Sequence, residues 1–431
     1  MFLYFFYYIM YEYVEHSPLN LANLYRSSPV PELLTDNDYR NSRQQQQRSQ
    51  QLRQKQQQLA QQQQLYRQLT LPNSNPEIPA KKRRGYAEYT KKTTDQELIN
   101  KLYGCIYGAI VGDAIGARYE FLESRKAKEQ VAVDFKDGIT ILGGGWLKIQ
   151  AGQITDDSEL MLSLLSSIAE LKTYDQEHVA QKYILWYKTE PIDVGKTIKN
   201  SLSTRVDSKD SKDMIDISRE VNSSSLSNGV LMRIAPIGIL SYTLSSKDIR
   251  SIVSDECDLT HPNPVIKEAA FIYCLCIKYL LKKLDTMELM QKLINKAQIP
   301  SVKTILMYAI RQIDEIPVNK EDIFIKTDDR RYQGYFGVAL QNAFYELVHC
   351  DNYNEGIINI IKRGGDTDTN CVIAGALLGA KFGIYSVDVN LIKQIESTDI
   401  PRYQQYTFLS PSLTIERINK IFNIEKSEEL Q

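Results

Sequence analysis

The sequence has few of the residues that build zinc sites or disulfide frameworks. Four histidines are scattered along its 431 residues, and the six cysteines form no C-x-x-C pair. A structural zinc site needs Cys or His ligands at close spacing, so this pattern argues against one. Most cysteines lie in apolar, helix-like runs, which predicts buried free thiols in a reducing compartment such as the cytoplasm.

An excess of charge of either sign is also lacking. Lys and Arg number 52 against 53 Asp and Glu, which gives a formal net charge of −1. Such a balance provides no general attraction to nucleic acid or to an anionic membrane surface. We therefore expect neither as a partner.

No apolar run is long enough to span a bilayer. Residues 1–10 are apolar and aromatic, but Glu12 and Glu15 follow well before the roughly 20 apolar residues of a spanning helix. This segment also lacks the basic start and the small-residue cleavage site of a signal peptide. The composition favours a disordered or loosely docked tail, with a signal anchor as the alternative.

The first part of the chain does not have the composition of a packed domain. Residues 44–68 are dominated by glutamine, which cannot bury enough apolar surface to offset the entropy cost of ordering. Residues 1–95 are therefore predicted to be a low-complexity, disordered extension and linker. Leu52, Leu59 and Tyr66 lie seven residues apart, so a weak coiled coil is the alternative for this tract.

A short basic run lies near the end of this extension. It consists of Lys81, Lys82, Arg83 and Arg84. A solvated charge run explains it, and a nuclear import signal is the alternative.

From about residue 95, apolar residues recur at i, i+3, i+4 and i+7, the pattern of amphipathic helices. The predicted helices cover residues 98–115, 158–171, 177–187, 266–284, 287–297, 302–313, 338–348, 355–361 and 369–382. No convincing alternating strand pattern and no short repeat accompanies them. The sequence predicts an all-α, compact domain over residues 96–425. Residues 207–222 and 318–334 are polar enough to be predicted as surface loops.

Two acidic segments precede predicted helices. In the first, Thr155, Asp156 and Asp157 lead into residues 158–171. Asp156 could cap the helix, with Glu159 completing a capping box. Two adjacent carboxylates repel each other unless a cation or solvent separates them, so a cation site is the other interpretation.

The second acidic segment has the same two interpretations. Gly364 and Gly365 permit unusual backbone angles, and Asp366, Asp368 and Thr369 follow them. If the two segments meet, their carboxylates and hydroxyls supply enough oxygens for two magnesium-like ions.

Serine, asparagine and glycine gather in a third segment that ends with Ser227, Asn228 and Gly229. Backbone N–H groups in such a run can cradle a phosphate, although a flexible loop has the same composition. Arg233 follows and could pair with a phosphate or with a structural acid.

Two further residues stand out by their surroundings. Glu120 follows a helix rich in Gly and Ala, where it could move protons beside a metal or lie at the surface. His261 is held between Thr260 and a proline, where it could contact a ligand or cap a helix.

Taken together, these segments resemble the ADP-ribosylglycohydrolases, a family that includes the dinitrogenase-reductase-activating and ADP-ribosylarginine-hydrolase types. Residues 108–121, 155–158, 228–236, 260–264 and 364–370 occur in the family's order. The resemblance runs from about residue 98 to residue 385.

The resemblance implies a compact, orthogonal multi-helix fold with two Mg²⁺ ions in a cleft, Mn²⁺ being a substitute. The metal ligands that it implies are Thr155, Asp156, Asp157, Asp366, Asp368 and Thr369. The catalytic carboxylates that follow from it are Glu120, Asp157 and Asp368. The substrate-binding residues that it implies are Ser227, Asn228, Gly229 and His261.

The expected function is hydrolysis of the N- or O-glycosyl bond that joins ADP-ribose to a protein side chain or a small molecule. A catalytically inactive ADP-ribose-binding or structural member on the same fold is the alternative. An unrelated Mg²⁺-dependent phosphohydrolase is a third candidate. A monomer is expected, and the acceptor, which could be arginine, serine, another ADP-ribose or a small molecule, stays open.

Overall fold

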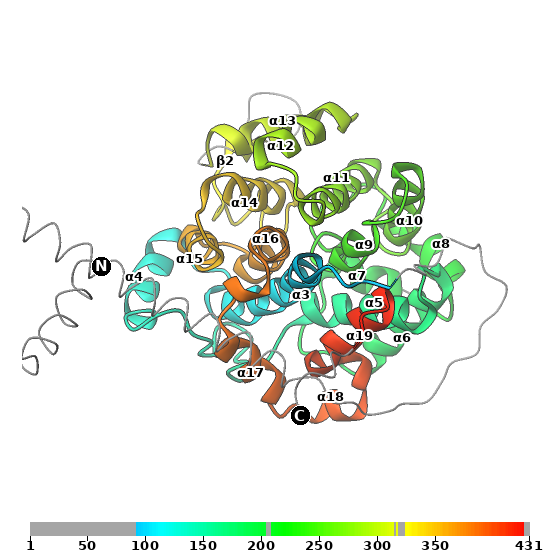
Figure 1. Ribbon diagram of the computed structural model, residues 1–431, viewed down its shortest axis with the longest axis horizontal. Coiled ribbons are helices and arrows are strands. Elements are labelled where there is room, and N and C mark those ends of the chain that lie inside the picture. The colour runs from blue at the N-terminus through cyan, green and yellow to red at the C-terminus, as the bar shows by residue number, and fades with distance from the viewer. Residues whose placement is uncertain (1–91, 204–207, 314–315, 318–323, 426–431) are drawn as a thin grey trace, which may run out of the picture. The chain divides into compact units, whose positions relative to one another are not determined.

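The described part of the chain is built almost entirely of helices (Figure 1). The computed structural model describes residues 92–203, 208–313, 316–317 and 324–425. The first helices are α3 (Gln96–Gly116), α4 (Ser124–Asp134), α5 (Asp156–Leu171), α6 (Gln176–Lys188), α7 (Lys196–Leu202) and α8 (Ser211–Val221). The next are α9 (Ala235–Leu240), α10 (Ser246–Asp258), α11 (Pro264–Leu281), α12 (Thr286–Lys296) and α13 (Pro300–Arg311). The last are α14 (Phe336–His349), α15 (Tyr353–Arg363), α16 (Thr367–Phe382), α17 (Val389–Ser397), α18 (Pro401–Gln405) and α19 (Thr414–Phe422).

Short turns and one small strand pair complete the structure. The 3₁₀ turns are η2 (Ala117–Tyr119), η3 (Ile384–Ser386), η4 (Thr407–Leu409) and η5 (Pro411–Leu413). Strands β1 (Ile316–Pro317) and β2 (Phe324–Ile325) pair antiparallel, with Ile316 opposite Ile325. The all-α prediction is confirmed, because these two-residue strands form no core layer.

Each helix predicted from apolar periodicity is present, with ends shifted by a few residues. The predicted surface loop at residues 207–222 is wrong, since α8 occupies most of it. The Asp210 side chain accepts a hydrogen bond from the Asp213 N–H and caps this helix. Met214 is its only buried apolar side chain, so the helix has a narrow apolar face that the polar composition hid.

The second predicted loop is partly outside the described residues, which omit residues 318–323. The proposed extension, with its apolar start, glutamine tract and basic run, falls in residues 1–91 and is likewise outside them.

Helices α3 and α16 pack closely at the centre of the described unit (Figure 1). Their contact is made by glycines four residues apart on α3, namely Gly104, Gly108, Gly112 and Gly116. A Cβ added at Gly108 would lie 2.3 Å from the carbonyl oxygen of Gly375 on α16. The two backbones therefore touch where any larger side chain would separate them.

This close contact also aligns the ends of the two helices. At the C-terminal end of α3, the Gly116 carbonyl accepts a hydrogen bond of 2.8 Å from the Thr367 hydroxyl, at the start of α16. The residues just after α3 are thereby brought to the residues just before α16. This is the region where the acidic segments lie.

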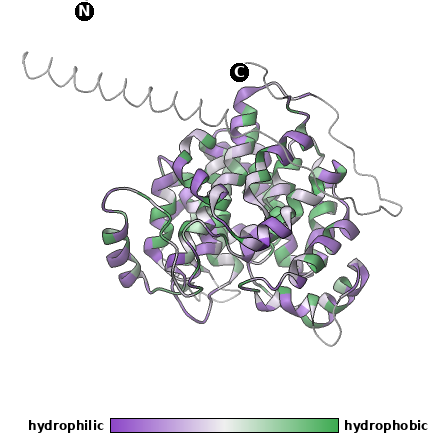
Figure 2. Ribbon diagram, turned by 90° about the horizontal axis from the view of Figure 1, so that it is seen from below, coloured by the Kyte–Doolittle hydropathy of each residue, from purple (hydrophilic) through white to green (hydrophobic). Residues whose placement is uncertain are grey.

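Buried apolar residues fill the middle of the unit, and apolar and polar residues alternate along its outer helices (Figure 2). All six cysteines are free and buried, as their apolar surroundings predict. Burial raises the pKa of the Cys105 and Cys257 thiols, which disfavours their reactive thiolate forms.

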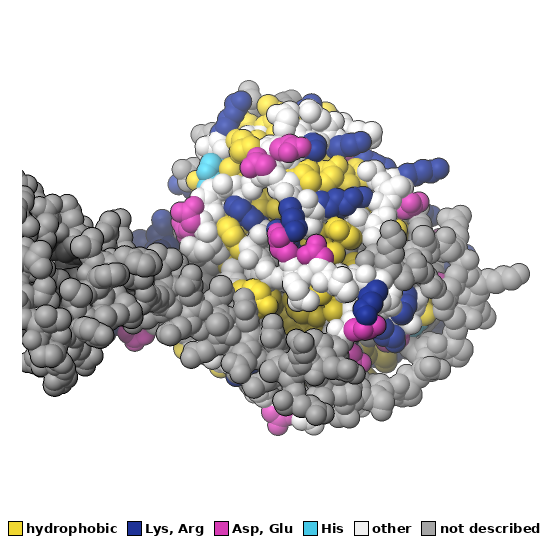
Figure 3. Space-filling model, in the orientation of Figure 1, with side chains coloured by type: hydrophobic (Ala, Val, Ile, Leu, Met, Phe, Trp, Pro, Cys, Tyr) yellow, Lys and Arg dark blue, Asp and Glu magenta, His cyan; other side chains and the backbone are white. Residues whose placement is uncertain are grey.

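On the face drawn in Figure 3, basic, acidic and apolar side chains of the described residues are mixed with one another. Of the described helices, none has both the length and the apolar content to cross a membrane.

Candidate functional site

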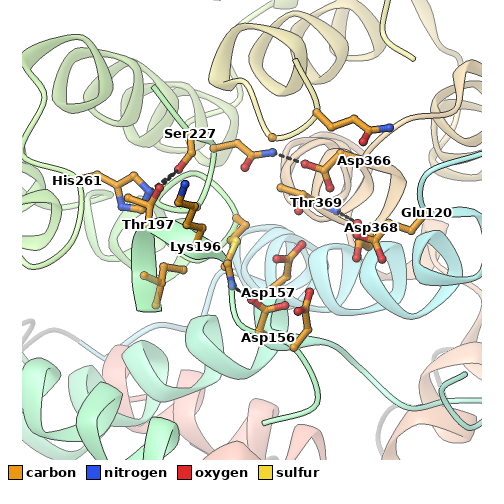
Figure 4. Close-up of a pocket in the computed structure, with 18 of the residues that line it drawn as sticks. Glu120, Asp156, Asp157, Lys196, Thr197, Ser227, His261, Asp366, Asp368 and Thr369 are labelled. Carbon is orange, nitrogen blue, oxygen red and sulfur yellow. Dashed lines mark hydrogen bonds between the residues drawn. The ribbon is translucent and has the colours of Figure 1, made fainter. Parts of the chain in front are cut away.

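A pocket of about 320 Å³ lies where seven segments of the chain converge (Figure 4). Its walls come from the turn after α3, the start of α5, the start of α7, the loop before α9, the loop before α11, the loop before α14 and the start of α16. The sequence-predicted residues that line it are Glu120, Asp156, Asp157, Ser227, Asn228, Gly229, His261, Asp366, Asp368 and Thr369. The two acidic segments, more than 200 residues apart, therefore face one cavity.

At the start of α5, the cap is Thr155 rather than Asp156. The Thr155 hydroxyl accepts from the Asp157 N–H at 3.4 Å. It also donates to Asp113 on α3 at 2.8 Å, so Thr155 lies behind the pocket lining. Asp113 accepts two further hydrogen bonds, from the backbone N–H groups of Thr155 and Ser158.

The capping-box interpretation of this segment is wrong. Glu159 accepts instead from the Trp186 indole at 2.8 Å and pairs with Arg402. With Asp113 and Thr155 satisfying the helix start, the carboxylates of Asp156 and Asp157 are left to face the pocket.

At the start of α16, glycines bring two loops together. Gly364 and Gly365 have φ of 73° and 82°, which only glycine adopts easily. The Gly365 carbonyl accepts from the Phe121 N–H at 2.7 Å, and the Gly365 N–H donates to the Leu122 carbonyl at 2.9 Å. These bonds hold the Glu120 turn against the second acidic segment.

As a result, Glu120, Asp366 and Asp368 each offer a carboxylate oxygen within 4.8 Å of the others. Asp366 is the N-cap of α16 but makes no side-chain capping bond. Its carboxylate accepts from the Asn228 amide at 2.8 Å instead, which rules out the simple helix-cap interpretation.

Burial and the mutual repulsion of the carboxylates set the electrostatics of this cluster. Burial, followed by the charge of Asp366, raises the pKa of Glu120 to about 9. Burial and neighbouring carboxylates likewise hold the pKa values of Asp156, Asp157 and Asp368 well above their usual range. The ionised cluster is therefore unfavourable by itself.

The donor set fits a hard divalent cation. Glu120 Oε2 and Asp157 Oδ2 are buried and have no hydrogen-bond partner within the described residues. The carboxylates of Glu120, Asp366 and Asp368 that lie together here are oxygen ligands of the kind that Mg²⁺ and Mn²⁺ prefer. A cation there would supply a countercharge.

The opposite wall carries the Ser-Asn-Gly segment and His261 (Figure 4). Ser227 Oγ lies 2.7 Å from His261 Nε2, and the Asn228 N–H donates to the Gly334 carbonyl at 2.8 Å. His261 is not a helix cap, because Asn263 caps α11. Burial, followed by the charge of Arg233, holds the pKa of His261 well below its usual range, so its ring is neutral.

Arg233 pairs with a structural acid, which settles the choice that its sequence context left open. Its Nε donates to Glu256 at 2.9 Å, and both side chains are fully buried. The guanidinium does not line the pocket.

The pocket residues that the sequence did not predict include Asp193, Lys196 and Thr197. They lie at the start of α7 or just before it, and this helix is too short to show a periodic apolar pattern. Pro191 and Gly195 mark a turn in this stretch, which was the available signal.

Known proteins resemble this chain over most of its length. A family model described as ADP-ribosylglycohydrolase matches residues 94–417. The chain belongs to the ADP-ribosylglycohydrolase family. Members of this family are hydrolases, and the protein is accordingly a hydrolase.

The chain aligns with most of the length of its individual relatives. An Acanthamoeba polyphaga mimivirus protein named ADP-ribosyl glycohydrolase L543 is 32% identical over 320 residues, 72% of this chain and 94% of the relative. The ADP-ribosyl-(dinitrogen reductase) glycohydrolase of Rhodospirillum rubrum is 24% identical over 303 residues, 70% of this chain and 92% of the relative.

A solved structure named "ADP-ribosylglycohydrolase-related protein complex" has the same fold. It matches with a TM-score of 0.55 at 19% identity, covering 75% of this chain and 99% of that chain. The fold predicted for this ADP-ribosylglycohydrolase is confirmed.

Proposed function

We propose that this ADP-ribosylglycohydrolase frees ADP-ribose from an ADP-ribosylated protein or a small ADP-ribose conjugate, and that it needs Mg²⁺ or Mn²⁺ to do so. The observation that carries the proposal is the pairing of two unlike walls in one pocket. An all-oxygen acidic cluster faces a Ser-Asn-Gly segment with a neutral histidine. The first suits a cation and sugar hydroxyls, and the second suits a diphosphate.

The residues proposed to hold two ions are Thr155, Asp156, Asp157, Asp366, Asp368 and Thr369. A bound divalent cation supplies Lewis-acid chemistry and lowers the pKa of a bound water. Asp113 keeps Thr155 in place by accepting its hydroxyl hydrogen, and the Asp157 N–H takes one lone pair of that oxygen, which leaves the other for a further contact.

Proton transfer is assigned to carboxylates beside the reacting bond. Glu120, Asp157 and Asp368 are the candidates for accepting a proton from the attacking water. Glu120 and Asp157 each have a buried oxygen without a partner among the described residues, and such an oxygen is available to take a proton.

Anion binding is assigned to Ser227, Asn228, Gly229 and His261. Lys196 joins them, since it is the one Lys or Arg among the described pocket-lining residues. Figure 4 shows its amino end on the side of the pocket where Ser227 and Thr197 lie. A cation on that side suits a diphosphate.

The test is a panel of arginine-linked, serine-linked and poly-linked ADP-ribose substrates, assayed with Mg²⁺ and with EDTA. We expect release of ADP-ribose from at least one linkage, and loss of release in EDTA. The preferred linkage identifies the acceptor class. Binding of ADP-ribose without cleavage of any linkage would favour a non-catalytic role, and release of phosphate would point to a phosphohydrolase.

Asp368→Ala tests the acidic cluster directly. We expect kcat to fall by more than about 100-fold, since even outer partners of a metal site are worth 10- to 100-fold. Asp137→Ala, at an exposed position outside the pocket, is the matched control. Unchanged turnover by Asp368→Ala in excess Mg²⁺ would rule the proposal out.

A further inference from the structure

A buried chain of polar side chains reaches the pocket wall from the protein core. It starts at the ion pair of Arg233 and Glu256, both fully buried. Arg233 Nη2 donates to Thr260 Oγ1 at 2.8 Å, and Thr260 Oγ1 lies 2.7 Å from His261 Nδ1. His261 Nε2 in turn lies 2.7 Å from Ser227 Oγ at the pocket.

The donor and acceptor roles along this chain can be assigned from its first member. A guanidinium only donates, so the Thr260 hydroxyl must accept from Arg233. Thr260 is 1% exposed, and among the described residues its hydroxyl has no hydrogen-bond partner other than Arg233 and His261. Satisfying it requires His261 Nδ1 to be the acceptor.

The tautomer of His261 then follows. Its ring is neutral, so a bare Nδ1 means that the single ring hydrogen is on Nε2. Nε2 donates to Ser227 Oγ, and Ser227 is left with its own hydrogen to donate. The acceptor in the absence of a ligand is Thr197 Oγ1, at a long 3.3 Å.

We infer that Arg233 and Thr260 are positioning residues, which hold His261 as the Nε2–H tautomer and thereby make the Ser227 hydroxyl a hydrogen-bond donor to a phosphate oxygen of the ligand. The inference deepens the proposed function and rests on it for the identity of the ligand. A phosphate oxygen can only accept, so a hydroxyl committed to donation suits it.

The local contacts allow Ser227 to change partner at little cost. Thr197 Oγ1 has a second and shorter contact, at 3.0 Å, with Ser225 Oγ. When Ser227 turns to a ligand, Thr197 therefore keeps a partner. Ser225 does not line the pocket, which makes it a matched control for Ser227.

The first experiment observes the tautomer directly. Long-range ¹H–¹⁵N spectra of the full-length chain, labelled at its four histidines, would be compared with those of His261→Gln to assign the ring signals. We expect a bare Nδ1 and a protonated Nε2 between about pH 6 and 8, the range in which a free histidine titrates.

Two variants of Thr260 test what holds that tautomer. In Thr260→Val the single-tautomer pattern should be lost, and in Thr260→Ser it should be retained. A wild-type ring protonated on Nδ1, or an unchanged pattern in Thr260→Val, overturns the inference.

The second experiment measures the consequence for binding. Thr260→Val should raise the Kd for ADP-ribose about tenfold, the size of one good hydrogen bond, with kcat changed less than about threefold. Ser227→Ala should raise the Kd by about the same factor, whereas Ser225→Ala should change Kd less than about twofold.

Non-additivity separates a positioning role from a merely structural one. The double variant Thr260→Val with Ser227→Ala should bind about as weakly as either single variant, because both remove the same hydrogen bond. Fully additive losses would sink the inference.

Failure of the proposed function would look different. A wild-type chain that cleaves no ADP-ribose conjugate but shows the Nε2–H tautomer defeats the function and keeps the hydrogen-bond assignment. Cleavage together with a protonated Nδ1 defeats the inference alone.

Discussion

At the scale of single residues, Lys196 is where the charge of the pocket can be tested most simply. It is exposed at the start of α7, and its neighbours in the pocket lining are otherwise acidic or neutral. Replacing it by Met keeps most of the side-chain volume and removes the charge. If Lys196 contacts a diphosphate, Lys196→Met should raise KM for an ADP-ribose conjugate about threefold at low salt, the size of an exposed ion pair.

Lys199→Met is the matched control, since Lys199 is exposed on the same helix but does not line this pocket. The difference in KM between the two variants should shrink as ionic strength rises. Equal KM values for both variants at low salt would remove Lys196 from the substrate site.

The acidic residues of the pocket could be predicted from the sequence, but the residues that orient them could not. Asp156, Asp157, Asp366 and Asp368 can be predicted because neighbouring carboxylates repel each other unless a cation or solvent separates them, and the chain has two such segments before helices. The Asp113 contact with Thr155 and the Asn228 contact with Asp366 cannot be predicted, because they join positions 42 and 138 residues apart. Such contacts depend on helix packing, which no local pattern encodes.

At the scale of helices, the α3–α16 contact determines whether the acidic cluster can form. Gly108→Ala would place a Cβ 2.3 Å from a backbone oxygen of α16, where no side chain can move aside. We expect the free energy of unfolding to fall by about 3 kcal/mol, the upper part of the range for overpacking. Denaturant unfolding followed by circular dichroism measures this.

Gly195→Ala provides the comparison for stability. Its added Cβ would have nothing nearer than 3.9 Å, and its stability should stay close to wild type. Equal stability of Gly108→Ala and wild type would mean that α3 and α16 do not approach as closely as described here.

Helix length explains which elements the sequence predicted. Helices such as α5 and α11 bury broad apolar faces over several turns, so their period is clear. Helix α7 has seven residues, and α8 buries only Met214 and Ser218. The positions of these two helices are set by contacts with other elements. The pocket residues on α7 therefore could not be predicted from a periodic pattern.

At the scale of the whole molecule, the acidic cluster links stability to pH and to cations. In the folded, cation-free protein the pKa of Glu120 is raised to about 9 from 4.5, mainly by burial. The folded state therefore binds more protons than the unfolded chain between these values. Stability from this group is present below the unfolded pKa and is lost as pH rises through the folded one.

Asp156, Asp157 and Asp368 shift in the same direction and act with the same sign. In EDTA we expect the free energy of unfolding to fall between about pH 5 and pH 9, the window set by Glu120, by up to roughly 1.4 kcal/mol per pH unit from that group, and the three aspartates should add to the fall. Glu120→Gln should make this slope shallower, because it removes one of the titrating groups without changing the side chain's shape.

Divalent cations should reverse the trend, because they bind the ionised carboxylates of the folded state. Mg²⁺ should raise the midpoint of thermal unfolding more at pH 8 than at pH 6, and Asp368→Asn should lose most of that gain. A midpoint that rises with pH in EDTA and does not respond to Mg²⁺ or Mn²⁺ at pH 8 would contradict the cation site. Enzyme activity plays no part in this measurement, so the cation site is tested separately from the reaction.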